Sequence, residues 1–144
     1  KGMIKGQVLD IISENKQIDE KTLLSIDKNK TAKILQASML AGGILANASK
    51  EDLIKIEAAG YYLGISFQIK DDLLDIQSTT EVLGKPINSD IKNNKSTYIS
   101  IYGEKKAEDD LKKYTDKTIE ILNDLKLMNE FLQDFILKLL ERIN

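Results

Sequence analysis

Apolar residues recur at the three-to-four-residue spacing of an amphipathic helix along most of the chain, and no segment shows the alternation of a β-strand. We therefore expect an all-α protein. The expected helices span residues 3–13, 19–26, 31–47, 49–77, 97–102, 107–125 and 129–143. The polar residues 27–29 predict a break, and the stretch 84–96, rich in Gly, Asn, Ser and Lys, predicts a loop.

Two local signals refine this helical pattern. Ser49 and Asp52 resemble a capping box and predict the start of an unusually long helix, 49–77. Gly42 and Gly43 lie inside another predicted helix, where each glycine costs about 1 kcal/mol relative to alanine. Such a pair indicates a close helix crossing or a bend.

Composition narrows the chemistry that is available. The chain has 144 residues, a formal net charge of -2, no cysteine and no histidine. The charge lacks the basic excess of a nucleic-acid binder, and any bound metal should be a hard, oxygen-seeking ion such as Mg²⁺. No apolar run reaches the roughly 20 residues of a transmembrane segment. The chain opens on 1–4 directly in a helical pattern, so we expect it to begin within a longer protein.

The segment 60–76, GYYLGISFQIKDDLLDI, is the most informative part of the sequence. On a helix, four polar side chains fall within an arc of about 100°: Gln68, Asp71, Asp72 and Asp75. Clustered carboxylates repel one another unless a cation or solvent compensates them. The one-turn spacing of Asp71 and Asp75 suits a shared metal ion, although a string of this kind alone is more often a solvated acidic face. Gly60 and Gly64 continue the stripe and predict room beside the acids.

Lysines on the predicted loop are candidates for phosphate binding. Lys85 and Lys95 flank Asp90, and a lysine ammonium is a compact charge suited to phosphate oxygens. On its own, this stretch is better explained as an ordinary surface loop. It is not a Walker phosphate loop, because the first glycine of that motif is missing.

Two further pairs of polar residues lie on the N-terminal helices. Lys30 and Thr31 are predicted at a helix start, where a lysine beside free N–H groups can bind an anion. Gln7 and Asp10 lie three residues apart on the first helix. Taken alone, Lys30 and Thr31 are better explained as an ordinary helix terminus. A solvent-exposed rim position explains Gln7 and Asp10 nearly as well as a functional role does.

Taken in order along the chain, these motifs resemble those of the trans-isoprenyl diphosphate synthases, the polyprenyl synthetases of farnesyl and geranylgeranyl type. The matching segments are GQVLD at 6–10, KT at 30–31, FQIKDDLLD at 67–75, GK at 84–85, and the stretch from Asp90 to Thr97. The resemblance implies a helical bundle of the isoprenoid synthase type around an apolar cavity. Residues 1–144 would form the C-terminal half of that single domain, in a protein that is usually a cytoplasmic homodimer.

The resemblance also implies an activity and roles for particular residues. The family condenses an allylic diphosphate with isopentenyl diphosphate, using about three Mg²⁺ ions per active site to assist ionisation. The implied Mg²⁺ ligands are Asp71, Asp72 and Asp75, with Asp71 the best candidate for direct ligation. The implied ligands of the allylic diphosphate are Lys30, Lys85 and Lys95, with Thr31 beside it. The implied isopentenyl diphosphate neighbours are Phe67 and Gln68, and Gln7 and Asp10 would line the cavity near the reacting carbons. The implied catalytic residues are Asp71, Asp72, Lys30 and Lys85.

The chain departs from the family in lacking the first Asp-rich motif and the upstream lysine and arginines. We therefore expect the 144 residues alone to be inactive, and the full-length form to be a prenyltransferase of the farnesyl diphosphate synthase type. Product length depends mainly on residues near that missing motif. The alternatives are a non-catalytic helical subunit of a heteromeric prenyl synthase, a class I terpene cyclase, and a helical interaction module with an incidental acidic patch. The NSE or DTE motif of a class I terpene cyclase is not found here in a helical context.

Overall fold

The computed structural model describes residues 2–77 and 95–141, and within these ranges every regular element is a helix. The helices are α1 (Met3–Ser13), α2 (Glu20–Asp27), the π-helical turn η1 (Lys28–Ala32), α3 (Lys33–Leu45), α4 (Lys50–Gln77), α7 (Tyr98–Tyr102), α8 (Glu104–Asp124) and α9 (Glu130–Glu141). The all-α prediction is confirmed. No helix in the described part of the chain is long and apolar enough to cross a membrane.

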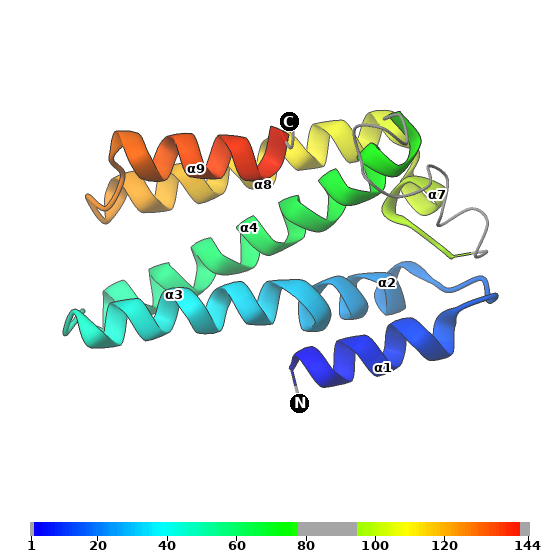
Figure 1. The fold of residues 1–144 in the computed structure, drawn as a ribbon, viewed down its shortest axis with the longest axis horizontal. Helices are drawn as coiled ribbons and strands as arrows, with labels where there is room; N and C mark the ends of the chain where they lie inside the picture. Colours follow the sequence, from blue (N-terminus) through cyan, green and yellow to red (C-terminus); the bar gives the residue numbers. More distant parts are fainter. Residues whose placement is uncertain (1, 78–94, 142–144) are drawn as a thin grey trace.

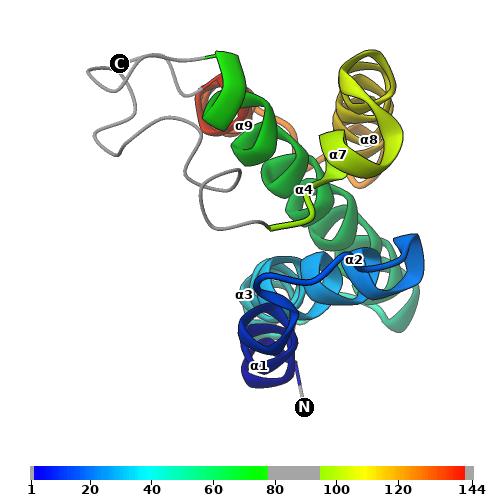
Figure 2. The ribbon, with the colours of Figure 1, turned by 90° about the vertical axis from the view of Figure 1, so that its right-hand side faces the viewer.

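The long helix α4 lies at the centre of the molecule. It packs most extensively against α8 and α3, and Figures 1 and 2 show it between a layer of α1, α2 and α3 and a second layer of α8 and α9. A helix with apolar residues all around it is typically buried, and α4 contributes to both apolar clusters of the core. Its buried apolar residues are Ile56, Ala59, Leu63, Ile65, Ile69, Leu73 and Leu74.

Glycines allow α3, η1 and α4 to approach closely. A Cβ atom on Gly64 would lie 2.3 Å from the Cα of Ala32, and one on Gly60 would lie 2.9 Å from the Cα of Gln36. The expectation that Gly60 and Gly64 leave room beside the acids is therefore wrong, because the backbone of η1 and α3 fills that space. A Cβ on Gly43 would meet side chains of α4 at 2.9 Å, which confirms the close helix crossing expected there.

The break predicted at residues 27–29 is also wrong. Asp27, Lys28 and Ala32 all have right-handed helical backbone angles, and α2, η1 and α3 follow one another without interruption. Asp27 and Ala32 are buried, with exposed fractions of 3% and 0%. Tertiary packing at these two residues therefore holds the segment helical, despite the weak helix propensity of the polar residues between them. Lys30 therefore lies inside a helical segment and not at the helix start that was expected there.

Candidate functional site

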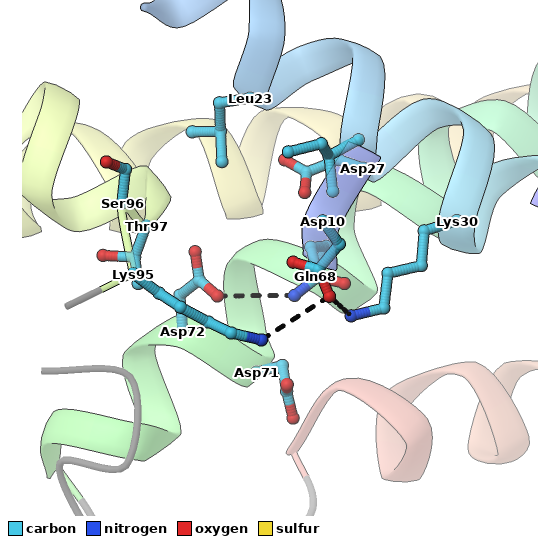
Figure 3. Close-up of a pocket in the computed structure, with 11 residues that line it drawn as sticks. Asp10, Leu23, Asp27, Lys30, Gln68, Asp71, Asp72, Lys95, Ser96 and Thr97 are labelled. Atoms are coloured by element: carbon cyan, nitrogen blue, oxygen red, sulfur yellow. Dashed lines mark hydrogen bonds and ion pairs between the residues drawn. The ribbon is translucent and has the colours of Figure 1, made fainter. Parts of the chain in front are cut away.

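A cavity of about 70 Å³ opens between α1, α2, η1, α4 and the segment before α7 (Figure 3). Its lining residues are Asp10, Leu23, Ile26, Asp27, Lys30, Gln68, Asp71, Asp72, Lys95, Ser96 and Thr97. Four of them carry carboxyl groups and two carry ammonium groups, so the described lining is polar and rich in charge. It unites residues from four of the motifs that the sequence singled out.

Glycine at position 6 allows α1 to lie directly on the π-helical turn. A Cβ atom there would lie 2.1 Å from the backbone nitrogen of Lys30 and 2.6 Å from the carbonyl carbon of Asn29. Asp10 follows one turn further along α1, and its Oδ2 atom accepts a hydrogen bond from the Lys30 ammonium at 2.7 Å. The close contact at Gly6 thus positions the Lys30–Asp10 ion pair. π-Helical turns occur frequently at functional sites.

A second lysine reaches the same carboxylate oxygen from a different part of the chain. The Lys95 Nζ atom lies 3.5 Å from Asp10 Oδ2 and 3.5 Å from Glu14 Oε1. Figure 3 shows the Lys30 and Lys95 side chains pointing toward each other across the cavity, with Asp10 between them. Two of the lysines predicted to bind phosphate therefore converge on one point.

The three acids of α4 have different surroundings. Asp71 lines the cavity and is partly exposed. Asp72 is buried, and its Oδ2 atom accepts a hydrogen bond from the backbone N–H of Tyr98 at 2.7 Å, which ties α4 to the start of α7. Asp75 is 1% exposed and is not among the residues that line this cavity. Within 2–77 and 95–141, no three acidic side chains lie close enough together to form a metal site.

The remaining predicted residues have different positions relative to this cavity. The Thr31 hydroxyl donates to Gln68 Oε1 at 3.2 Å, so these two are brought together beside Lys30. Phe67 and Thr31 line a separate, mostly apolar hollow of about 180 Å³. Gln7 is exposed and does not line the charged cavity. Two further candidates, Lys85 and Asp90, lie outside the described residues.

The sequence analysis missed Asp27. This residue lines the cavity at 3% exposure, and its Oδ2 atom has no hydrogen-bond partner among the described residues. Burial raises the pKa of the Asp27 carboxyl well above its usual range, the nearby Asp72 and Asp10 raise it further, and Lys30 opposes the shift. Asp27 and Lys30 are three residues apart, which places them on the same face of a helix. The predicted break at 27–29 concealed this signal.

The geometry of the described residues defines a class of protein. It is an all-α fold whose central helix presents carboxylates to lysines from two other segments, within one charged cavity. Lysines bind anions such as phosphates, whereas carboxylate oxygens bind hard divalent cations. Such a site is suited to an anionic phosphate compound that binds together with Mg²⁺.

Comparison with known proteins identifies the family. The model of the polyprenyl synthetase family matches residues 1–134, and the chain belongs to that family. It is 38% identical over 133 residues to the farnesyl diphosphate synthase of Bacillus subtilis, covering 92% of this chain and 45% of that protein. It is 33% identical to the farnesyl diphosphate synthase of Micrococcus luteus, covering 98% of this chain and 48% of that protein. The chain thus spans about half the length of the curated relatives it matches.

A solved structure supports the same grouping. The geranyltransferase of Helicobacter pylori, crystallised with magnesium and isoprenyl diphosphate, is 28% identical with a TM-score of 0.77. The match covers 97% of this chain and 46% of that chain. The chain therefore shares the fold of isoprenyl diphosphate synthases.

Proposed function

We propose that the complete protein containing this chain is a prenyltransferase. It condenses an allylic diphosphate with isopentenyl diphosphate to give a longer trans-prenyl diphosphate, such as farnesyl or geranylgeranyl diphosphate. The observation that carries the proposal is the convergence of Lys30 and Lys95 on one oxygen of Asp10, beside Asp71 and Asp72. This arrangement offers positive charge for a diphosphate and carboxylate oxygens for Mg²⁺ within one cavity.

The proposed reaction begins when the bond between the allylic carbon and the diphosphate oxygen breaks. The electron pair remains on the diphosphate, and the carbon becomes a delocalised cation. The Lys30 and Lys95 ammonium groups stabilise the charge that develops on the leaving group, and bound Mg²⁺ supplies Lewis-acid stabilisation of the same oxygens. The double bond of isopentenyl diphosphate then attacks the cation and forms the new carbon–carbon bond. The resulting cation loses a proton, which we propose that the departing diphosphate accepts, and a new double bond forms.

Mg²⁺ binding by the acids of α4 is part of the proposal. Mg²⁺ is usually bound by one or two carboxylates, several waters and substrate phosphates rather than by a complete protein cage. Asp71 is the proposed direct ligand because it lines the cavity while partly exposed. Asp72 and Asp75 complete the proposed acidic set, although one oxygen of Asp72 already accepts the Tyr98 N–H. Asp27 also lines this cavity, and its Oδ2 atom has no hydrogen-bond partner among the described residues.

The other proposed roles follow the family resemblance. Lys85 binds the allylic diphosphate together with Lys30 and Lys95, and Thr31 lies beside that diphosphate. Gln68 and Phe67 approach isopentenyl diphosphate, and Gln7 and Asp10 face the reacting carbons. We further propose that the complete protein is a cytoplasmic homodimer, as the family resemblance implies. About three Mg²⁺ ions per active site would supply Lewis-acid stabilisation of the diphosphate charge.

Substitution of Asp71 tests this function. In the complete polypeptide, Asp71→Ala should lower turnover by about two or more orders of magnitude, the range expected when a main stabiliser of transition-state charge is lost. The assay is incorporation of radiolabelled isopentenyl diphosphate in the presence of Mg²⁺, and circular dichroism should show unchanged helix content. An Asp71→Ala protein that retains full activity would contradict the assignment.

The same assay separates the alternatives. A terpene cyclase converts an allylic diphosphate without incorporating isopentenyl diphosphate. A non-catalytic subunit incorporates label only when a second, active polypeptide is added. Either result from the wild-type complete polypeptide would replace the proposed function.

A further inference from the structure

We propose that Asp10 is a positioning residue that holds the two cavity lysines on one point and occupies the place of a diphosphate oxygen until substrate binds. This inference rests on the proposed function, because it takes Lys30 and Lys95 as ligands of the diphosphate. It adds a role for Asp10 before substrate binds, in competition with the substrate.

The contacts of one oxygen atom carry the inference. Asp10 Oδ2 lies 2.7 Å from Lys30 Nζ and 3.5 Å from Lys95 Nζ. The two lysines belong to segments that are far apart in the sequence, η1 and the stretch before α7. Among the described residues, Asp10 is the acid to which both of these lysines are paired.

Electrostatics explains why such a residue is needed. Two ammonium groups that approach the same point repel each other, and this repulsion is larger in a partly buried site than in bulk water. The side chain of Asp10 is only 16% exposed, and those of Lys30 and Lys95 are 33% and 23% exposed. A carboxylate between the two ammonium groups therefore keeps them converged before any substrate arrives.

The backbone fixes Asp10 in this position. α1 lies so close to η1 that a Cβ on Gly6 would overlap the backbone of Lys30, and Asp10 follows one turn later on the same helix. The backbone of Asp10 therefore cannot move away from the lysines without displacing α1. A bound diphosphate must consequently take over both ammonium groups while Asp10 stays nearby, and its binding is weakened by that competition.

The competition predicts that loss of the Asp10 charge increases the affinity for a diphosphate. Replacing Asp10 by asparagine keeps the size of the side chain and removes its charge, so a diphosphate should bind more tightly. A residue with a purely structural role would give unchanged or weaker binding when it is replaced. Glu14 offers a matched control, since it lies one turn further along α1, pairs with Lys95 at 3.5 Å, and is more exposed at 44%.

The experiment measures binding of inorganic pyrophosphate to the complete polypeptide by isothermal titration calorimetry, with EDTA present so that only the protein charges contribute. Asp10→Asn should lower the Kd for pyrophosphate about five-fold or more, because a competing anion is removed from the lysines. Glu14→Gln should change it by less than about two-fold, since exposed pairs contribute little. Lys30→Gln and Lys95→Gln should each raise it. If Asp10→Asn loses helix content, Asp10→Ser removes the same charge with a smaller side chain and carries the same expectation.

Each outcome bears on one of the two proposals. If the lysine variants weaken pyrophosphate binding while Asp10→Asn leaves it unchanged or weaker, the positioning role is wrong and the proposed function stands. If wild-type protein binds no pyrophosphate without Mg²⁺, or the lysine variants bind it as well as wild type does, the positioning role is wrong. The Mg²⁺-dependent incorporation assay then decides the proposed function separately. Tighter binding by Asp10→Asn, together with an unchanged Glu14→Gln, supports the positioning role. For catalysis, the same role predicts a lower KM of Asp10→Asn for the allylic diphosphate with no rise in kcat.

Discussion

The contact between α1 and η1 gives the sharpest stability prediction. A Cβ atom added by Gly6→Ala would lie 2.1 Å from the Lys30 backbone nitrogen, whereas ordinary van der Waals contacts of Cβ begin at 3.4 Å. The overlap is with backbone, so no side-chain rotation can relieve it. α1 must therefore retreat from η1 by about 1 Å, and it carries Asp10 away from Lys30 as it moves.

Two opposed effects determine how much Gly6→Ala changes the free energy of unfolding. Alanine is favoured over glycine inside a helix by about 1 kcal/mol, while overpacking of a closely packed contact costs about 1–3 kcal/mol and occasionally more. Because rigid backbone is involved, the cost should be at the upper end. We expect Gly6→Ala to lower the free energy of unfolding by about 2 kcal/mol, a large share of the stability of a typical domain.

Gly42→Ala is the matched control for this prediction. Gly42 also lies inside a helix, but a Cβ there would meet nothing within 4 Å. This variant should raise the free energy of unfolding by roughly 0.5–1 kcal/mol. Urea unfolding of the complete polypeptide, followed by circular dichroism, measures both variants. If Gly6→Ala proves as stable as wild type while Gly42→Ala behaves as expected, the close packing of α1 on η1 is refuted.

Two further substitutions test the buried acids. Asp72→Ala should lower the free energy of unfolding by about 1–3 kcal/mol, because the buried N–H of Tyr98 loses its acceptor; an unchanged urea midpoint would rule out this link between α4 and α7. Asp27→Asn tests pH dependence. The pKa of the Asp27 carboxyl is raised in the folded state by burial, so the folded protein binds this proton more tightly than the unfolded chain does. The contribution of this carboxyl to the free energy of unfolding is fully present below its unfolded pKa of about 3.8. That contribution is lost as the pH rises through the higher pKa of the folded state. Asp27→Asn should therefore gain stability relative to wild type as pH rises above about 4, and a pH-independent difference between the two proteins would contradict this.

Sequence periodicity was sufficient to predict most of the helices. The expected helix 3–13 coincides with α1, and the expected helix 49–77 differs from α4 by one residue. Helical spacing of apolar residues predicts both helices, and Ser49 with Asp52 marks the start of the second, so local sequence decides them. The error at 27–29 arose where polar residues have weak helix propensity and packing against α4 decides the outcome.

The candidate site was predictable in part. The ordered motifs indicated that Asp10, Lys30, Gln68, Asp71 and Lys95 belong together, and all five line one cavity. The spatial meaning of Gly60 and Gly64 could not be read from one helix, because it depends on which neighbour covers that face. Asp27 was missed for a related reason, since its burial depends on the continuity of α2, η1 and α3.

The central claim is that this cavity of lysines and carboxylates binds a diphosphate together with Mg²⁺. A crystal structure of the complete protein with Mg²⁺ and a non-hydrolysable allylic diphosphate analogue tests it most directly. The account predicts diphosphate oxygens within hydrogen-bond distance of the Lys30 and Lys95 ammonium groups, and an Mg²⁺ ion bound to Asp71. A diphosphate found elsewhere in the protein, with Lys30 and Lys95 still paired to Asp10, would contradict it.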